Sequence, residues 1–191
     1  MKTLKYLSLL FITSLSLTAC SSDNDPEPVN EEELITTVTA TFVPQGGGTT
    51  ITLKSQDLDG DGGNAPVITV SGKFEQNKTY NGTVTFLNES VNPAEDITEE
   101  IEEEGDEHQI FYIKTGSLNG FTYSTDANNL DSNGLPIGLQ TVFNTTNAAS
   151  GNLTIILRHE PNKSASGVSN GDITNAGGST DASVTFSIEV E

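Results

Sequence analysis

Short stretches in which apolar and polar residues alternate occupy the chain from Leu34 onwards, and a period of two is typical of β-strands that bury one face. Val38, Ala40 and Phe42 alternate with threonines in the first stretch, which is rich in β-branched residues. A glycine-rich turn at residues 45–48 leads into a second stretch of the same kind, so the two predict a hairpin. The expected strands lie at residues 34–43, 49–53, 67–70, 79–87, 109–114, 121–124, 137–143, 153–158 and 184–190.

Turn-forming residues separate these stretches and indicate the fold class. Asn119-Gly120, Asn133-Gly134, Ser150-Gly151 and Gly177-Gly178 each lie between two expected strands. No helical period dominates the chain, and it contains no internal repeat. A series of about nine short strands with such turns predicts an all-β protein, and more specifically an immunoglobulin-like Greek-key β-sandwich.

One segment, residues 92–105, departs from this pattern and predicts a short helix. Pro93 suits a first helical position, and Gly105 suits the position just after the last turn. Ile97 and Ile101 are four residues apart, so both would face the sheet. Acidic residues cover the outer face and continue into the last turn, where the helix dipole disfavours negative charge. The fold prediction therefore includes one short acidic helix inserted between two strands.

Residues 1–19 are typical of an export signal. Two lysines precede an apolar segment at residues 7–17, which is shorter than the roughly 20 residues that span a bilayer. Residues 17–20, Leu-Thr-Ala-Cys, resemble the lipobox of bacterial lipoproteins. The resemblance implies cleavage before Cys20, a diacylglyceryl group on its sulfur and a further acyl chain, such as palmitate, on the new N-terminus. We therefore expect a lipoprotein signal peptide followed by a stable lipid anchor at Cys20.

The next segment, residues 20–33, is predicted to be a flexible tether. It contains six acidic residues, two prolines and almost no apolar side chains, so it cannot offset the entropy lost on folding. A run rich in Ser and Asp after the lipidated cysteine is similar to the surface-export signal of lipoproteins in the Bacteroidota, and Ser21 in place of Asp argues against retention at the inner membrane. We expect a β-sandwich domain at residues 34–191, held at the outer membrane on its periplasmic or cell-surface face.

The charge balance narrows the range of partners. The chain carries 27 acidic residues against 8 lysines and arginines, which gives a net charge of −19. Removal of residues 1–19 would take away two lysines and no acidic residue, leaving about −21. Such a surface repels phosphate backbones, so we expect no nucleic-acid partner. Cations, or a basic face on another protein, are the natural complements.

Carboxylates at alternate positions make one loop a candidate calcium site. Asp57, Asp59 and Asp61 could converge on one hard cation, and Gly62 permits the sharp turn that this requires. The match to an EF-hand loop stops there, because the twelfth position, which needs a bidentate acid, is Ile68. Two interpretations stay open: a calcium loop completed by acids from elsewhere, and a solvated hairpin loop without an ion.

The two histidines of the chain are the candidate ligands for a transition metal. His108 follows Glu107 at the start of one expected strand, and His159 precedes Glu160 at the end of another. Imidazole and carboxylate groups together make mixed nitrogen and oxygen sites for zinc or copper. If the two strand ends meet in space, the four side chains form a divalent-metal site.

Two other interpretations of this region are open. In the first, the acidic residues form a solvated face and the histidines are surface or cross-strand residues. In the second, Arg158 and Lys163 dock onto the acidic helix as an ion-pair network, in which each exposed pair contributes little stability.

The chain offers little for catalysis. We expect no Gly-x-Ser-x-Gly nucleophile elbow, no phosphate loop and no His-Glu-x-x-His site, and neither histidine adjoins a candidate nucleophile. Cys20 is the only cysteine, so its lipidation would leave the domain without a thiol or a disulfide. The absence of tryptophan and the presence of only four tyrosines argue against an aromatic sugar-binding platform. We therefore expect a binding protein and not an enzyme.

Three stretches, residues 57–66, 86–100 and 157–163, give the chain a family resemblance that covers nearly its whole length. They resemble small surface-type lipoproteins of flavobacterial-type Bacteroidota. This group is sometimes labelled as having a type 1 periplasmic-binding fold, an α/β architecture that does not suit a chain of successive short strands.

Lipoproteins of this kind often accompany TonB-dependent outer-membrane transporters. The resemblance therefore implies a lipid-anchored accessory that captures a divalent metal or small ligand, or docks on such a transporter. The alternative is a structural or adhesive cell-surface module without a small-molecule ligand.

Overall fold

The computed structural model describes residues 34–60 and 62–191. The expected signal peptide, the lipid anchor at Cys20 and the tether up to residue 33 lie outside the described residues, as does Asp61 of the candidate calcium loop. None of the helices in the described residues has the length and apolar character needed to cross a membrane.

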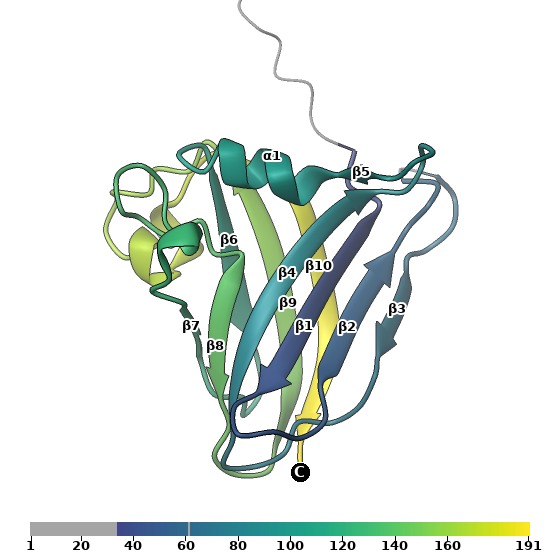
Figure 1. Cartoon of the computed structure of the whole chain (residues 1–191), viewed down its shortest axis with the longest axis vertical. Helices are drawn as coiled ribbons and strands as arrows, with labels where there is room; N and C mark the ends of the chain where they lie inside the picture. Colours follow the sequence, from purple (N-terminus) through teal and green to yellow (C-terminus); the bar gives the residue numbers. More distant parts are fainter. Residues whose placement is uncertain (1–33, 61) are drawn as a thin grey trace, which may run out of the picture. The chain divides into compact units, whose positions relative to one another are not determined.

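Ten strands in this part of the chain form two antiparallel sheets, which Figure 1 shows one behind the other. The larger sheet has the order β3 (Val67–Val70), β2 (Ile51–Gln56), β1 (Thr37–Pro44), β4 (Thr79–Asn88), β8 (Gln140–Asn144) and β7 (Phe121–Tyr123), with β5 (Glu95–Asp96) paired to the end of β4. The smaller sheet has the order β10 (Ser179–Val190), β9 (Ala149–His159) and β6 (His108–Lys114). The all-β sandwich is thus confirmed, while its immunoglobulin-like Greek-key assignment stays a prediction.

Each of the expected strands has a counterpart in the structure. The hairpin of β1 and β2 forms as expected, with Phe42 opposite Ile51. The two-residue β5 is additional, and β8 begins at Gln140, three residues after the expected start. β9 and β10 begin earlier than expected, at Ala149 and Ser179. The early start of β10 matters below, because it brings a further acidic side chain into the smaller sheet.

The two sheets share one hydrophobic core. Phe42 of β1 and Phe143 of β8 both pack against Phe74, with ring centroids 5.3 and 5.1 Å from it, and all three side chains are fully buried. Leu157 of β9 and Phe186 of β10 contribute from the smaller sheet. Burial of each such side chain contributes roughly 1.5–3 kcal/mol, which holds the two sheets face to face.

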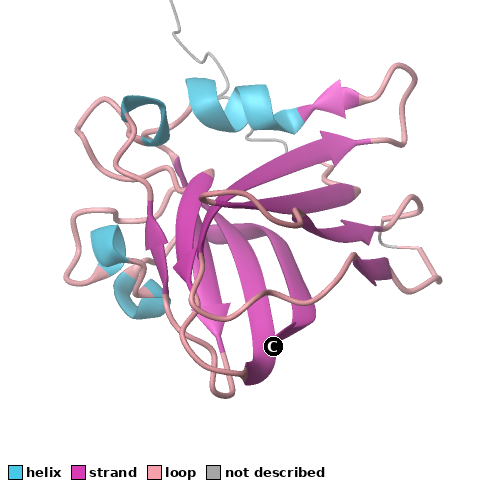
Figure 2. Ribbon diagram, turned by 60° about the horizontal axis from the view of Figure 1, so that its bottom comes forward, coloured by secondary structure: helices cyan, strands magenta, loops and turns pink. Residues whose placement is uncertain are grey.

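The helix α1 (Ile97–Glu103) lies across one end of the sheets, as Figures 1 and 2 show. Its hydrophobic residues, Ile97 and Ile101, are buried as expected. Asp96 caps the helix by accepting a hydrogen bond from the Thr98 amide at 3.0 Å. The expected start at Pro93 is wrong by four residues, because β5 pairs with β4 before the helix begins.

A buried lysine contacts the turn that follows α1. The last turn of the helix contains no basic residue. Instead the ammonium group of Lys163, from the β9–β10 connection, donates hydrogen bonds to the carbonyl oxygen of Gly105 and, at 2.9 Å, to Asp131 Oδ2. Arg158 donates to the carbonyl oxygens of Gly177 and Gly178, not to the helix. Among the described residues, neither cation pairs with an acidic side chain of α1, so the interpretation of an ion-pair network with the helix is wrong, and Lys163 reaches only the turn that follows it.

The connection from β9 to β10, residues 160–178, contains two 3-10 helices that the sequence did not predict, η2 (Val168–Asn170) and η3 (Ile173–Asn175). Val168 and Ala176 from this connection pack with Phe111 of β6 in a second, smaller core. A third 3-10 helix, η1 (Ala127–Asn129), precedes Asp131. The packing on Phe111 fixes the path of the connection and hence the place where β10 begins.

Candidate functional site

The two histidines lie side by side at one end of the smaller sheet. β6 begins at His108 and β9 ends at His159, and the antiparallel register pairs these two residues directly. Their ring centroids are 4.7 Å apart, His108 is fully buried and His159 is 7% exposed. The two strand ends therefore meet in space, as the metal-site hypothesis requires.

The turn after α1 holds His108 in one orientation. Its Nδ1 atom lies 3.2 Å from the backbone oxygen of Glu104. Because a carbonyl oxygen can only accept a hydrogen bond, Nδ1 carries the proton and Nε2 carries the lone pair. Nε2 is buried and has no hydrogen-bond partner among the described residues. Burial lowers the pKa of His108, so the ring is held in the neutral form, which is the form that binds metal ions.

Asp181 is not among the expected ligands, yet it completes this group. It lies in β10 where the register with β9 shifts between Thr180 and Ala182, and its side chain is only 4% exposed. Its Oδ2 atom is 3.9 Å from His108 Nε2 and also 3.9 Å from His159 Nδ1. One carboxylate oxygen therefore faces both imidazole rings from the third strand of the sheet.

Glu107 and Glu160 lie on the outer side of the same pair of strand ends, and both are exposed. The Glu160 amide donates a hydrogen bond to the Glu107 carbonyl oxygen at 2.7 Å, which continues the pairing of the two histidines by one residue. Glu107 Oε2 is 3.7 Å from His159 Nε2. The candidate ligands thus form two groups that share His159: a buried group with His108 and Asp181, and an exposed group with Glu107 and Glu160.

A close backbone contact fixes the position of β10 against the end of β9. Gly178 has a φ of +68°, and a Cβ atom added to it would lie 2.0 Å from the carbonyl oxygen of His159. Only glycine allows this approach. The guanidinium group of Arg158 donates to the carbonyl oxygens of Gly177 and Gly178, which pins the chain just before it enters β10. These contacts fix the place of Asp181 beside the histidines.

The described residues of the candidate calcium loop, Asp57 and Asp59, form no comparable group. Asp59 Oδ2 accepts a hydrogen bond from Asn64 Nδ2 at 2.7 Å, and this bond lowers the pKa of Asp59. Burial raises the pKa of Asp57, which disfavours its charged form. Among the described residues, neither carboxylate belongs to a set of three potential metal ligands, and Asp61 lies outside them.

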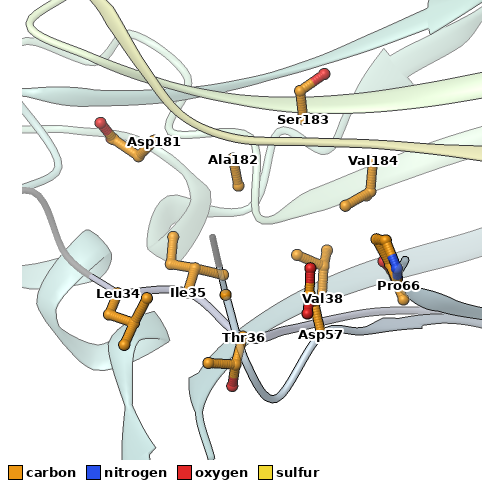
Figure 3. Close-up of a pocket in the computed structure, with 12 residues that line it drawn as sticks. Leu34, Ile35, Thr36, Val38, Asp57, Pro66, Asp181, Ala182, Ser183 and Val184 are labelled. Atoms are coloured by element: carbon orange, nitrogen blue, oxygen red, sulfur yellow. The ribbon is translucent and has the colours of Figure 1, made fainter. Parts of the chain in front are cut away.

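A cavity of about 390 Å³ borders the buried group. Figure 3 shows its apolar walls, with Ile35 and Val38 on one side and Ala182 on the other, and with Asp181 at one margin. Asp57 also lines this cavity. Asp181 therefore adjoins both the histidine pair and this cavity.

Two imidazole nitrogens and a carboxylate oxygen are a ligand set that suits zinc or copper. Four ligands at the usual zinc distances stand about 3.3 Å from one another. The two separations of 3.9 Å exceed this by about half an ångström, which small side-chain rotations can remove. Calcium prefers six to eight oxygen ligands and suits the buried group less well.

The expected absence of a Gly-x-Ser-x-Gly sequence is wrong, because residues 167–171 match this local motif of hydrolases. Its Ser169 lies in η2, a 3-10 turn between two strands, whereas a nucleophile elbow lies between a strand and an α-helix. Ser169 lines a separate cavity of about 530 Å³ with Tyr123, and no histidine is among the residues that line it. The structural context of the motif is therefore not that of a nucleophile.

Comparison with known protein families, curated proteins and solved structures found no significant match to the chain. The functional interpretation therefore depends on the residues themselves.

Proposed function

We propose that this protein binds a divalent transition-metal ion through His108, His159 and Asp181. The observation that carries the proposal is the lone pair of His108 Nε2, which is buried, lacks a hydrogen-bond partner among the described residues and lies 3.9 Å from Asp181 Oδ2. Leaving a buried polar atom without a partner costs free energy. A metal ion between the two histidines and the carboxylate would satisfy that atom.

A proton is the competing occupant of the same space. Protonation of His108 at Nε2 would make an ion pair with Asp181, but burial of the ring lowers the pKa of His108 and so disfavours it. A divalent metal ion carries two positive charges where a proton carries one, and it can coordinate His108 Nε2 and His159 Nδ1 at the same time. The carbonyl oxygen of Glu104 already orients His108 in the way that outer partners orient metal-bound histidines.

The cellular setting in this proposal comes from the N-terminal residues. Cleavage before Cys20 and its lipidation would anchor the domain at the outer membrane, on the periplasmic or cell-surface face, through an acidic tether. A net charge of about −21 would concentrate cations near the protein. We propose a role as an accessory in metal capture, handing an ion to a TonB-dependent transporter.

A second candidate function is docking on another protein, as a transporter accessory or as an adhesive module. It is favoured by β3, the edge strand of the larger sheet, whose four residues are all exposed. Val67 is 64% exposed and Ile68 is 44% exposed. An exposed apolar edge strand can pair with a strand of a partner.

Metal titration of the purified full chain in a mild non-ionic detergent tests the metal-binding proposal. We expect saturable binding of zinc and copper by isothermal calorimetry, weakened at least about tenfold in His108→Gln and in Asp181→Asn. Asp126→Asn, which makes the same charge change at an exposed position, is the matched control and should bind like the wild type. Equal affinity in Asp181→Asn, Asp126→Asn and the wild type, with circular dichroism showing folded proteins, would contradict the proposal.

A further inference from the structure

We infer that His159 bridges two metal ions, one in the buried group and one in the exposed group. This inference rests on the proposed function and extends it from one ion to two. His159 Nδ1 lies 3.9 Å from Asp181 Oδ2, whereas Nε2, on the other side of the ring, lies 3.7 Å from Glu107 Oε2. The two ring nitrogens thus point to two different carboxylate groups.

The two ions would have different surroundings. The inner ion takes His108 Nε2, His159 Nδ1 and Asp181, whose side chains are nearly inaccessible to solvent. The outer ion takes His159 Nε2 with Glu107 and Glu160, both exposed, and completes its coordination with water. Metal–nitrogen distances of about 2 Å place the two ions about 6 Å apart across the imidazole ring.

The charges of the two groups balance only when both ions are bound. One divalent ion in the buried group faces a single carboxylate, Asp181, which leaves one positive charge uncompensated in a poorly solvated place. Two divalent ions carry four positive charges. Asp181, Glu107, Glu160 and a deprotonated His159 together carry four negative charges, so the two-ion centre is neutral.

Binding through both nitrogens requires a defined proton change. A neutral imidazole has one nitrogen with a lone pair and one N–H group. When the second ion binds, the remaining ring N–H bond of His159 breaks, the proton goes to the buffer and its electron pair forms the second metal–nitrogen bond. The second ion therefore releases one proton from His159 for each chain.

The test is zinc calorimetry on the purified full chain at pH 8, repeated in buffers that differ in ionisation enthalpy. We expect two zinc ions per chain, with one proton released on binding the second. The double variant Glu107→Gln, Glu160→Gln should bind one ion and release no proton. Glu99→Gln, Glu102→Gln, with the same charge change on exposed residues of α1, is the matched control and should bind two.

Copper provides a direct test of the bridge, because two Cu²⁺ ions that share one imidazolate are magnetically coupled. We expect a coupled electron paramagnetic resonance spectrum from the two-copper protein and an isolated-copper spectrum from the glutamine double variant. A single zinc ion whose binding does not depend on Glu107 and Glu160, or two uncoupled copper ions, would overturn the bridge and leave the proposed function intact. Absence of any zinc binding would overturn both.

Discussion

Replacement of Lys163 by methionine is expected to be among the most destabilising single changes outside the hydrophobic core. The side chains of Lys163 and Asp131 are 4% and 1% exposed, and Lys163 Nζ lies 2.9 Å from Asp131 Oδ2. Methionine keeps the apolar stem of the lysine but removes the cation. It therefore leaves a buried carboxylate without its counter-charge and the Gly105 carbonyl oxygen without its donor.

The magnitude follows from the burial of the pair. Removing one partner of a buried ion pair costs about 3–5 kcal/mol, because the remaining charge is uncompensated. For a domain of this size each kcal/mol lowers Tm by about 2–4 °C, so Lys163→Met should lower it by roughly 6–20 °C. The same loss should weaken zinc binding, since Lys163 fixes the turn that leads from α1 to His108.

Thermal and urea unfolding followed by circular dichroism measure this effect, with Lys73→Met as the matched control. Lys73 Nζ also lies 2.9 Å from a carboxylate, that of Glu191, but the two side chains are 50% and 66% exposed. Lys73 Nζ also lies 3.1 Å from Glu189 Oε2, and loss of each exposed pair should cost less than about 1 kcal/mol.

A double variant tests whether the lost stability comes from the uncompensated charge of Asp131. Asn at position 131 keeps an acceptor for the backbone amides that bond to Asp131 Oδ1, so Lys163→Met combined with Asp131→Asn should recover at least about half of the lost stability. If Lys163→Met proves no more destabilising than Lys73→Met, the reasoning from burial is refuted.

Two further changes test the contacts around the site and the effect of pH. Gly178→Ala should destabilise the fold and weaken zinc binding about tenfold, because the new Cβ atom would meet the His159 carbonyl oxygen. Gly177→Ala is the control, since Gly177 has a similar φ of +64° but nothing lies close to the position of its Cβ atom. This variant should cost only about 1 kcal/mol in unfolding experiments. Burial raises the pKa of Tyr123 to about 12, so above pH 10 the unfolded chain loses a proton that the folded chain keeps, and stability should fall as the pH rises from 10 to 12. In Tyr123→Phe the alkaline loss between pH 10 and 12, measured by urea unfolding at each pH, should be smaller by roughly 2 kcal/mol; an unchanged loss would contradict the assignment.

The strands could be predicted from the sequence because their burial pattern is local. Val38, Ala40 and Phe42 alternate with threonines, and the same residues face the core in β1. The expected start at Pro93 is four residues too early, because β5 pairs with β4 before the helix begins. A local signal for the true start is present in the sequence, since Asp96 is a favoured N-cap residue and Glu99 follows three residues later.

The histidine pair could be proposed from sequence because His108 and His159 each lie at a strand end beside a glutamate. Asp181 could not. A shift of register in β10 turns it inward, and a shift of this kind depends on how β9 and β10 pair. Gly177-Gly178 could be recognised as a turn in the sequence. The requirement for glycine at position 178 arises from its contact with the His159 carbonyl oxygen, which only the folded chain reveals.

The most direct test of the metal-binding proposal is a crystal structure of the zinc-loaded protein with anomalous diffraction measured at the zinc absorption edge. The proposal predicts an anomalous peak about 2.0–2.2 Å from His108 Nε2, His159 Nδ1 and a carboxylate oxygen of Asp181. A fully loaded crystal with no peak between these three residues, or with zinc bound only at other acidic positions, would contradict it.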